Sequence, residues 1–224
     1  MNAPIDQIDP IDPYTTALLI IDMQRDFCDP GGYAAQAGLD VAQLSAVVEN
    51  IRMLLDAARQ TGLTVIHTRE GHLPDLSDCP PLKLLRSQQA GAAIGSKGPM
   101  GRLLIRGEYG HDIIDELKPL EHETVIDKPG YGAFYKTGLE ALLAQRMNTL
   151  ILCGVTTEVC VHSTLREAVD RGFRCITVGD ACAASNPALQ QPALDMIAVE
   201  GGIFGSAATT DAVAAAIHAS YARN

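Results

Sequence analysis

Asp22, Lys128 and Cys160 are side chains with the chemistry of a covalent hydrolase, and each follows a short apolar run of this sequence. The run before Cys160 breaks at Gly154, and a helical pattern begins at once, so Cys160 lies just inside a helix start. Unpaired backbone N–H groups and the helix dipole at such a start favour a thiolate, the nucleophilic form of cysteine. An acid, a base and a thiol in these positions are suited to covalent catalysis.

Apolar runs of this kind recur along the chain and alternate with helical patterns. The runs are continuously apolar, which is typical of strands buried on both faces of a parallel sheet. We expect strands at 17–21, 63–67, 123–126, 149–153, 174–178 and, more weakly, 202–204. We expect helices near 40–60, 110–117, 138–145, 158–171, 187–199 and 211–221. The alternation predicts right-handed βαβ crossovers and a three-layer α/β/α, doubly wound parallel sheet.

Ligands of such a sheet bind beyond the carboxyl ends of the strands, where Asp22, Lys128 and Cys160 would converge. Taken singly, each also has a structural interpretation: Asp22 as a cap, Lys128 as a solvated lysine and Cys160 as a small buried hydrophobe. The segment 68–120 breaks the strand–helix rhythm and is rich in Gly, Pro, Arg and Ser. A connection of this length usually carries function or covers a site.

The composition limits the partners that this chain can have. Its formal net charge of −10, without a run of lysine or arginine, argues against nucleic acid and anionic membranes as partners. No apolar stretch approaches the roughly 18 residues of a membrane span, and residues 1–16 do not resemble a signal peptide. We therefore expect a cytoplasmic protein with a lead-in at 1–16 and one domain at 17–224. The six cysteines form no CxxC pair, which argues against a zinc ribbon or a dithiol redox site.

Three motifs, at residues 17–27, 125–128 and 154–161, together resemble the isochorismatase-like cysteine hydrolases. The motifs follow the family's order, and the similarity extends over nearly the whole chain. The resemblance implies a six-stranded parallel sheet flanked by helices, and a reaction that needs no metal and no cofactor. It also implies a homo-oligomer, commonly a tetramer. Apolar residues in the long segment and in the alanine-rich C-terminal helix also favour self-association.

The same resemblance implies roles for individual residues of these motifs. Asp22, Lys128 and Cys160 would form a catalytic triad with Cys160 as nucleophile. A cis peptide bond between Val155 and Thr156 would aim the backbone N–H groups of Thr156 and Cys160 at an oxyanion. We therefore expect Thr156 and Cys160 to form the oxyanion hole, with Val155 beside the substrate.

Within this family, residues 67–72, 106–108, 126–130 and 201–205 are most similar to biuret and triuret hydrolases. The expected substrate is therefore a small neutral ureide. The thiolate would attack its terminal carbonyl carbon, ammonia would leave, and water would hydrolyse the thioester-like intermediate.

Phe27, Arg69 and Glu200 are further candidates for substrate contacts. Glu200 stands where biuret hydrolases carry a glutamine, which favours triuret, because a longer ureide offers more N–H donors to a carboxylate. Phe27 would supply an apolar wall, and Arg69 would belong to the pocket or its lid. The alternatives are core packing for Phe27, a surface ion pair for Arg69 and a solvated helix end for Glu200.

Other functions stay open at this point. A different amidase of the family would act on ureidoacrylate, N-carbamoylsarcosine or nicotinamide. An ether hydrolase such as isochorismatase itself does not require a nucleophilic cysteine, so the intact triad argues against it. A non-catalytic, partner-binding domain has no reason to hold Cys160 unusually acidic.

Overall fold

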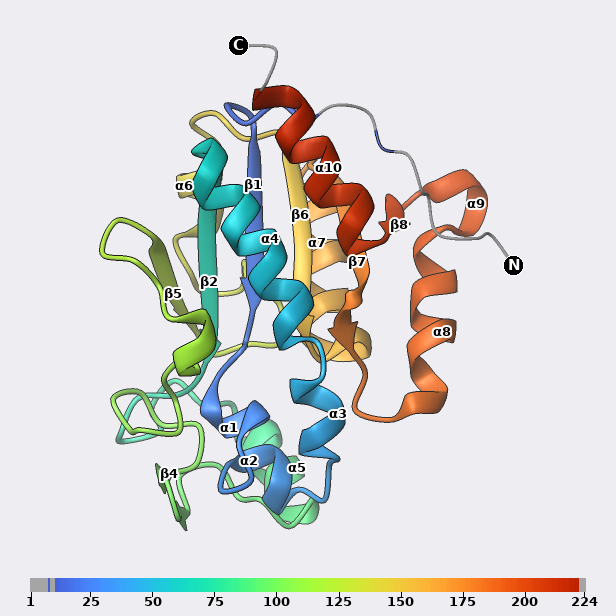
Figure 1. Ribbon diagram of the computed structural model, residues 1–224. Helices are drawn as coiled ribbons and strands as arrows, with labels where there is room; N and C mark the ends of the chain where they lie inside the picture. Colours follow the sequence, from blue (N-terminus) through green and yellow to red (C-terminus); the bar gives the residue numbers. More distant parts are fainter. Residues whose placement is uncertain (1–7, 9–10, 222–224) are drawn as a thin grey trace.

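A six-stranded, all-parallel sheet forms the centre of the computed structural model, which describes residue 8 and residues 11–221 (Figure 1). Most of the predicted lead-in at 1–16 lies outside the described residues. The strands of the sheet are β1 Thr16–Ile21, β2 Thr64–Glu70, β5 Thr124–Lys128, β6 Thr149–Val155, β7 Arg174–Ala183 and β8 Ser206–Ala208. Their order is β5-β2-β1-β6-β7-β8. The expected α/β fold class is confirmed.

Helices cover both faces of this sheet. The α-helices are α1 Arg25–Cys28, α2 Tyr33–Gln36, α3 Val41–Ser45, α4 Val48–Thr61, α5 Pro81–Gln89, α6 Leu139–Leu143, α7 His162–Asp170, α8 Pro187–Ile197, α9 Val199–Gly202 and α10 Thr210–Tyr221. The other elements are a 3-10 helix η1 Asp115–Leu117, a π-helix η2 Thr157–Val161 and a two-stranded antiparallel ribbon of β3 Lys97–Gly98 and β4 Gly101–Arg102. Figure 1 shows α4 and α10 in front of the sheet and α7 behind it. None of the helices in the described part of the chain has the length and apolar character to cross a membrane.

The continuous apolar runs match strands that are covered on both faces. Every residue of β1 is buried, because β2 and β6 flank it and helices lie on either side. On α4, Ile51, Leu54 and Leu55 form an apolar stripe that is fully removed from solvent. The helix ends where Gly62 takes a left-handed φ of 72°, as its sequence predicts.

The predicted helix at 110–117 is the largest error in the expected elements. Only η1 is helical, because the preceding backbone pairs instead with the segment after β1. The N–H groups of Arg25 and Asp26 donate to the carbonyls of Asp112 and Gly110, at 3.0 and 2.7 Å. A local sequence pattern does not contain these long-range hydrogen bonds.

Two smaller differences concern where a helix is interrupted and where a strand begins. The helix expected at 40–60 is divided into α3 and α4. The strand expected at 202–204 is wrong, since β8 begins only at Ser206. Gly202 and Gly205 have φ values of 89° and 112°, which a strand does not accommodate.

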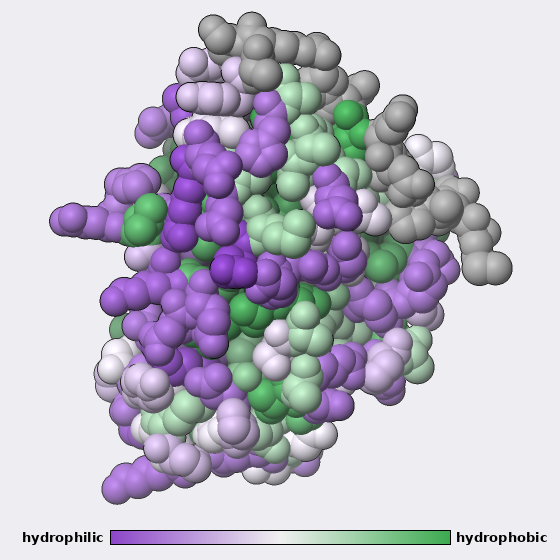
Figure 2. All heavy atoms as spheres, viewed as in Figure 1, coloured by the Kyte–Doolittle hydropathy of each residue, from purple (hydrophilic) through white to green (hydrophobic). Residues whose placement is uncertain are grey.

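Figure 2 shows apolar side chains gathered over α10 among charged residues on this face of the molecule. Ala215 and Ala219 of α10 are exposed. The expected self-association stays a prediction.

The carboxyl ends of β1 and β6 form the topological switch point of the sheet. β1 pairs with β6 on one side and with β2 on the other, and β6 leads to β7 and β8. Ligands of doubly wound sheets bind at such points. Asp22 directly follows β1, and η2, which contains Cys160, follows β6. The topology therefore brings an acid and a thiol to the carboxyl ends of two neighbouring strands.

Gly154 allows these two strands to approach closely at this point. It pairs with Ile21 and has a φ of 116°, and a Cβ atom there would lie 2.1 Å from the Ile21 carbonyl oxygen. Only glycine avoids both this clash and the backbone strain.

Gly154→Ala should therefore lower the free energy of unfolding by about 3 kcal/mol or more, because the backbone of β1 must move. Urea unfolding followed by circular dichroism measures this loss. Gly138→Ala is the matched control, since no atom lies within 4 Å of its Cβ position. It precedes α6, and we expect a cost of at most about 1 kcal/mol. Equal losses in the two variants would contradict the assigned clash.

Candidate active site

Asp22, Lys128 and Cys160 meet in one buried cluster beyond the carboxyl ends of β1, β5 and β6. Lys128 Nζ lies 2.8 Å from Asp22 Oδ2. The carboxylate of Asp22 and the sulfur of Cys160 lie within 4.8 Å of each other. Asp22 and Lys128 are completely buried, and Cys160 is 4% exposed. The structure thus brings together the three side chains that the sequence singled out.

Glu70, the last residue of β2, adds a second carboxylate to this cluster. Its Oε2 accepts a hydrogen bond from Cys160 Sγ at 3.3 Å and lies 3.5 Å from Lys128 Nζ. Its Oε1 lies 2.7 Å from the ammonium of Lys83, which belongs to α5. Neither Glu70 nor Lys83 had a role in our sequence-based prediction. The available signal was that Glu70, like Lys128, ends a strand of the sheet.

The buried amide of Gln24 fixes the backbone of Glu70. Its Oε1 accepts from the Glu70 N–H at 2.7 Å, and its Nε2 donates to the Glu70 carbonyl at 3.0 Å. The same Nε2 donates to the carbonyl of His111 at 2.8 Å. Because these groups are shielded from water, the hydrogen bonds hold the second carboxylate in place.

Both ammonium groups are anchored by the turn that follows β5. Lys128 Nζ donates to the carbonyls of Gly130 at 3.0 Å and Tyr131 at 2.8 Å. Lys83 Nζ donates to the carbonyl of Pro129 at 2.7 Å. Each cation therefore contacts a carboxylate and backbone carbonyls, which offsets part of the cost of burying it.

The two carboxylates have opposite protonation preferences. Burial raises the pKa of Asp22, although the positive charge of Lys128 opposes this shift. Burial also disfavours the charge on Glu70, but Lys83 and Lys128 outweigh it and lower the pKa of Glu70 to about 2. Glu70 thus favours its anionic form, and Asp22 is the better proton acceptor of the two. Two titratable groups whose environments move their pKa values apart typically take different acid–base roles in a site.

Cys160 lies in the π-helix η2, where its surroundings oppose loss of the thiol proton. Burial raises its pKa well above the ordinary thiol value, and the carboxylates of Asp22 and Glu70 add to the effect against the charge of Lys128. Burial and the two acids thus oppose the thiolate expected from the helix start, whose formation stays a prediction. That expectation counted the helix dipole and omitted burial beside two acids.

The peptide bond between Val155 and Thr156 is cis, as the resemblance implied. Val155 ends β6 and is buried, as is Thr156. Next to them, the hydroxyl of Thr157 donates to Gln190 Oε1 of α8 at 2.8 Å, which ties the start of η2 to that helix. The oxyanion role of Thr156 and Cys160 stays a prediction.

Comparison with known proteins shows the family and the fold of this chain. Residues 16–211 match the family description "Isochorismatase domain". The chain belongs to the isochorismatase family. A curated relative, the ureidoacrylate amidohydrolase RutB of Methylorubrum extorquens, is 35% identical over 95% of this chain and 86% of its own length.

Two solved structures show the same architecture as this isochorismatase-family chain. A cysteine hydrolase from Pseudomonas syringae pv. phaseolicola superposes with a TM-score of 0.81 and 31% identity, over 99% of this chain and 100% of its own. The N-carbamoylsarcosine amidase of Thermoplasma acidophilum has a TM-score of 0.67 and 26% identity, over 88% of this chain and 97% of its own. The curated relatives of this chain include ureidoacrylate amidohydrolases, and the finer similarity to biuret and triuret hydrolases stays a prediction.

Aromatic side chains of this family member stand close to the reactive cluster. Phe27 of α1 is buried and packs edge-on against Tyr33 of α2, with ring centroids 6.0 Å apart. Burial raises the pKa of Tyr33 to about 12, and the charges of Glu70 and Cys160 contribute to that shift. Tyr131, whose pKa is raised by burial and by Glu70, lies over the Lys83 ammonium at 4.8 Å. The predicted apolar wall at Phe27 is compatible with this placement, and the two tyrosines are additional candidates that sequence reasoning missed.

Arg69 lies on β2 but is engaged elsewhere. Its guanidinium pairs with Asp127 at 2.7 Å and with Asp112 at 2.8 Å. Neighbouring residues of a strand point to opposite faces, and Thr68 and Glu70 are the ones that reach the site; the Thr68 hydroxyl donates to Asp22 at 2.7 Å. The structure supports the ion-pair interpretation of Arg69 and not the predicted substrate contact.

Glu200 is not brought to the cluster either. It is exposed and lies in α9, which directly precedes β8. Because all strands are parallel, this position is at the amino ends of the strands, opposite to Asp22 and Cys160 (Figure 1). Within one chain the structure therefore separates Glu200 from the nucleophile, and its contact with the substrate stays a prediction.

Asp22, Glu70 and Cys160 also offer three ligand-type atoms within 4.8 Å of one another, the only such group among the described residues. Both carboxylates are already neutralised by ammonium groups, with Lys128 on Asp22 and Lys83 on Glu70. A divalent ion would add charge where two cations stand, so the cluster suits a metal poorly.

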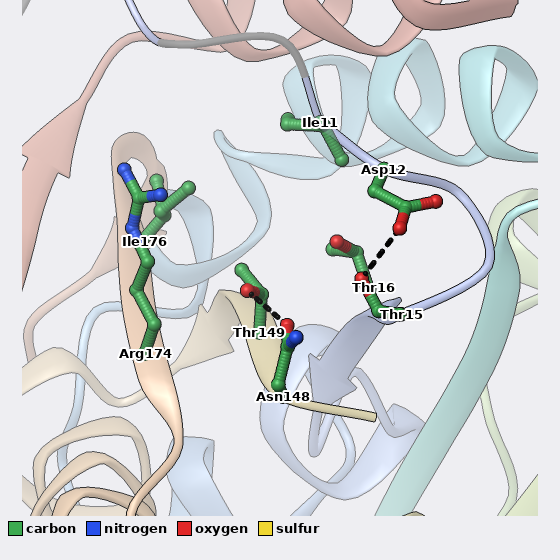
Figure 3. A pocket seen from close by; sticks show the side chains of 8 residues that line it. All are labelled: Ile11, Asp12, Thr15, Thr16, Asn148, Thr149, Arg174 and Ile176. Atoms are coloured by element: carbon green, nitrogen blue, oxygen red, sulfur yellow. Dashed lines mark hydrogen bonds between the residues drawn. The ribbon is translucent and has the colours of Figure 1, made fainter. Parts of the chain in front are cut away.

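A separate hollow of about 280 Å³ lies at the amino ends of β1, β6 and β7 (Figure 3). It is lined by Ile11, Asp12, Thr15, Thr16, Asn148, Thr149, Arg174 and Ile176. The length of the sheet separates it from the thiol, and its lining contains no nucleophilic cysteine. It is therefore not part of the candidate active site.

Proposed function

We propose that this protein is a cysteine amidohydrolase that cleaves a terminal carbamoyl group of a small substrate, with ureidoacrylate as the leading candidate. The observation that carries the proposal is the buried contact of Asp22, Lys128 and Cys160 at the switch point of the sheet. The names of the relatives add the substrate class, since ureidoacrylate and N-carbamoylsarcosine both carry a terminal carbamoyl group.

The proposed reaction begins with proton transfer from Cys160 to Asp22 as the sulfur attacks the carbamoyl carbon. The electron pair of the C=O bond moves to oxygen, where the backbone N–H groups of Thr156 and Cys160 donate to it. Asp22 then gives its proton to the leaving nitrogen, and the C–N bond breaks. Water attacks the remaining thioester-like carbonyl, Asp22 takes a proton from it, and the C–S bond breaks to restore the thiol.

The raised pKa of the thiol is compatible with this sequence of steps. A thiol that stays protonated at rest is protected from adventitious reaction, and it loses its proton when Asp22, the stronger base of the two carboxylates, receives it. Lys128 remains charged throughout, because its neighbours raise its pKa although burial opposes the charge. It thereby stabilises the negative charge that passes between sulfur and carboxylate.

Linear ureides such as biuret form the second candidate class. They share the carbamoyl end, and residues 67–72 and 126–130 resemble enzymes of that class. The preference for triuret rested on Glu200, which one chain alone does not bring to the cluster.

A non-catalytic, partner-binding domain is the less favoured alternative. Burying two carboxylates and two ammonium groups beside a thiol costs stability relative to apolar packing. Such an arrangement serves chemistry more readily than it serves a scaffold.

Release of ammonia from ureidoacrylate, biuret, triuret, N-carbamoylsarcosine and nicotinamide tests the proposal. We expect turnover of the carbamoyl compounds, fastest for ureidoacrylate, and little or none of nicotinamide, whose amide is attached to an aromatic ring. A preparation of Cys160→Ala serves as the blank. Equal turnover of nicotinamide, or no turnover of any carbamoyl compound, would refute the assignment.

A further inference from the structure

Glu70 touches the nucleophile, yet the proton transfers proposed above do not use it. Asp22 is the better base, because the pKa of Glu70 is about 2 while that of Asp22 is raised by burial. A charged carboxylate beside a sulfur that must become negative also opposes formation of the thiolate. A buried group that hinders one step needs a compensating role in another.

The position of Glu70 suggests which part of the substrate it meets. A carbonyl carbon ready for attack lies about 3–3.5 Å from the nucleophile. The nitrogen on that carbon is one bond further, about 1.33 Å. Because Glu70 Oε2 is itself 3.3 Å from Sγ, a group bonded to that carbon, such as this nitrogen, is within reach of the carboxylate.

An ionised carboxylate accepts hydrogen bonds and donates none. It repels the carbonyl oxygen of a substrate and the alkoxy oxygen of an ester, and it attracts N–H groups. At rest, Glu70 Oε2 accepts the S–H of Cys160. Once that proton has passed to Asp22, Oε2 keeps only the Lys128 ammonium at 3.5 Å, and it can accept an N–H of the substrate in exchange.

We propose that Glu70 is a specificity residue that recognises the N–H of the scissile carbamoyl group, so that the enzyme favours amides over esters of the same acyl group. The inference rests on the proposed function and deepens it. When the leaving nitrogen receives its proton from Asp22, it becomes positively charged, and the hydrogen bond to Glu70 strengthens. The interaction is therefore worth more in the transition state than in the bound substrate, which is the condition for raising the rate.

Lys83 is the positioning residue for this carboxylate. Its ammonium holds Glu70 Oε1 at 2.7 Å and the Pro129 carbonyl at 2.7 Å, which leaves Oε2 directed toward Cys160. Lys83 comes from α5, in the long segment between β2 and β5. The segment that interrupts the strand–helix rhythm thus supplies the group that sets the direction of Glu70.

The test compares kcat/KM for an amide and for the methyl ester with the same acyl group, such as biuret and methyl allophanate, using the fastest compound of the ammonia panel. In Glu70→Gln, we expect the amide-to-ester ratio to fall about 10- to 100-fold, the effect of losing a hydrogen bond to a charged group. Lys83→Met should lower the ratio in the same direction and less strongly. This second variant decides the question if Glu70→Gln does not fold.

Glu123→Gln is the matched control, because Glu123 is also a buried carboxylate paired with a cation, Arg59, at 2.8 Å. It precedes β5, at the end of the sheet away from Cys160, so its loss should leave the amide-to-ester ratio unchanged. If Glu70→Gln slows amide and ester equally, or changes neither, Glu70 does not recognise the leaving group and the inference is wrong. A wild-type enzyme that cleaves no carbamoyl compound would instead refute the proposed function.

Discussion

Cys160→Ala should abolish hydrolysis of the carbamoyl substrate, with kcat/KM falling about 10⁴-fold or more. In the proposed mechanism the sulfur forms the bond to carbon, and a methyl group cannot replace it. The fold should survive, since the substitution removes a single buried atom whose hydrogen-bond partner, Glu70, retains its contact with Lys83. Ammonia release and thermal unfolding, measured on the same preparation, separate loss of chemistry from loss of structure.

Cys153→Ala is the control for this substitution. Cys153 is also completely buried, but it lies within β6, and its thiol donates a long hydrogen bond to the Leu19 carbonyl at 3.9 Å. The Cys153→Ala enzyme should keep the activity of the wild type. If Cys160→Ala retained more than about one-hundredth of wild-type activity, the covalent mechanism would be untenable. Mass spectrometry of the wild-type enzyme, quenched during turnover, should detect the acyl group on Cys160.

Lys128→Met should impair both the reaction and the fold. We expect kcat/KM to fall about 10³-fold or more, because the charge between Asp22 and Cys160 loses its buried counter-ion. The free energy of unfolding should fall by about 3–5 kcal/mol at pH 7, the usual result of removing one partner of a buried ion pair. Asp22 and Glu70 are then two acids with one remaining cation, Lys83, near them.

The stability loss in Lys128→Met should depend on pH in a defined direction. Without Lys128, the pKa values of Asp22 and Glu70 in the folded state rise. A carboxyl group with a raised folded pKa takes up protons on folding, so the variant loses stability as pH increases above about 4. In the wild type, Glu70 has a pKa of about 2 instead of 4.5, and its stabilising contribution is complete above pH 4.5 and lost toward pH 2.

Urea unfolding between pH 4 and pH 7 measures this difference, and the gap between variant and wild type should widen toward pH 7. Lys97→Met, a change at an exposed lysine of β3, is the control and should alter stability by no more than about 0.5 kcal/mol at either pH. A gap that is the same at both pH values would mean that the buried carboxylates are not paired with Lys128 as described.

The sequence by itself determined five of the six strands of the sheet and where the triad residues stand relative to them. Continuous apolar runs identify buried parallel strands, and in a parallel sheet all carboxyl ends lie at one edge. Asp22, Lys128 and Cys160 could therefore be placed together from local patterns alone. The same local reasoning ended β2 too early, because its last residues, including Glu70, are polar and carry no apolar signal.

Only the tertiary structure added Glu70 and Lys83 to the site. Lys83 reaches Glu70 because α5 lies beyond the carboxyl ends of the strands (Figure 1), and no pattern near Lys83 records that contact. Glu200 lies near a motif in the chain but at the opposite end of the sheet. The protonation of Cys160 depends on the acids and the burial contributed by distant segments. Strand identity is a local property of the chain, whereas electrostatics and side-chain contact depend on which remote residues the fold brings within a few ångströms.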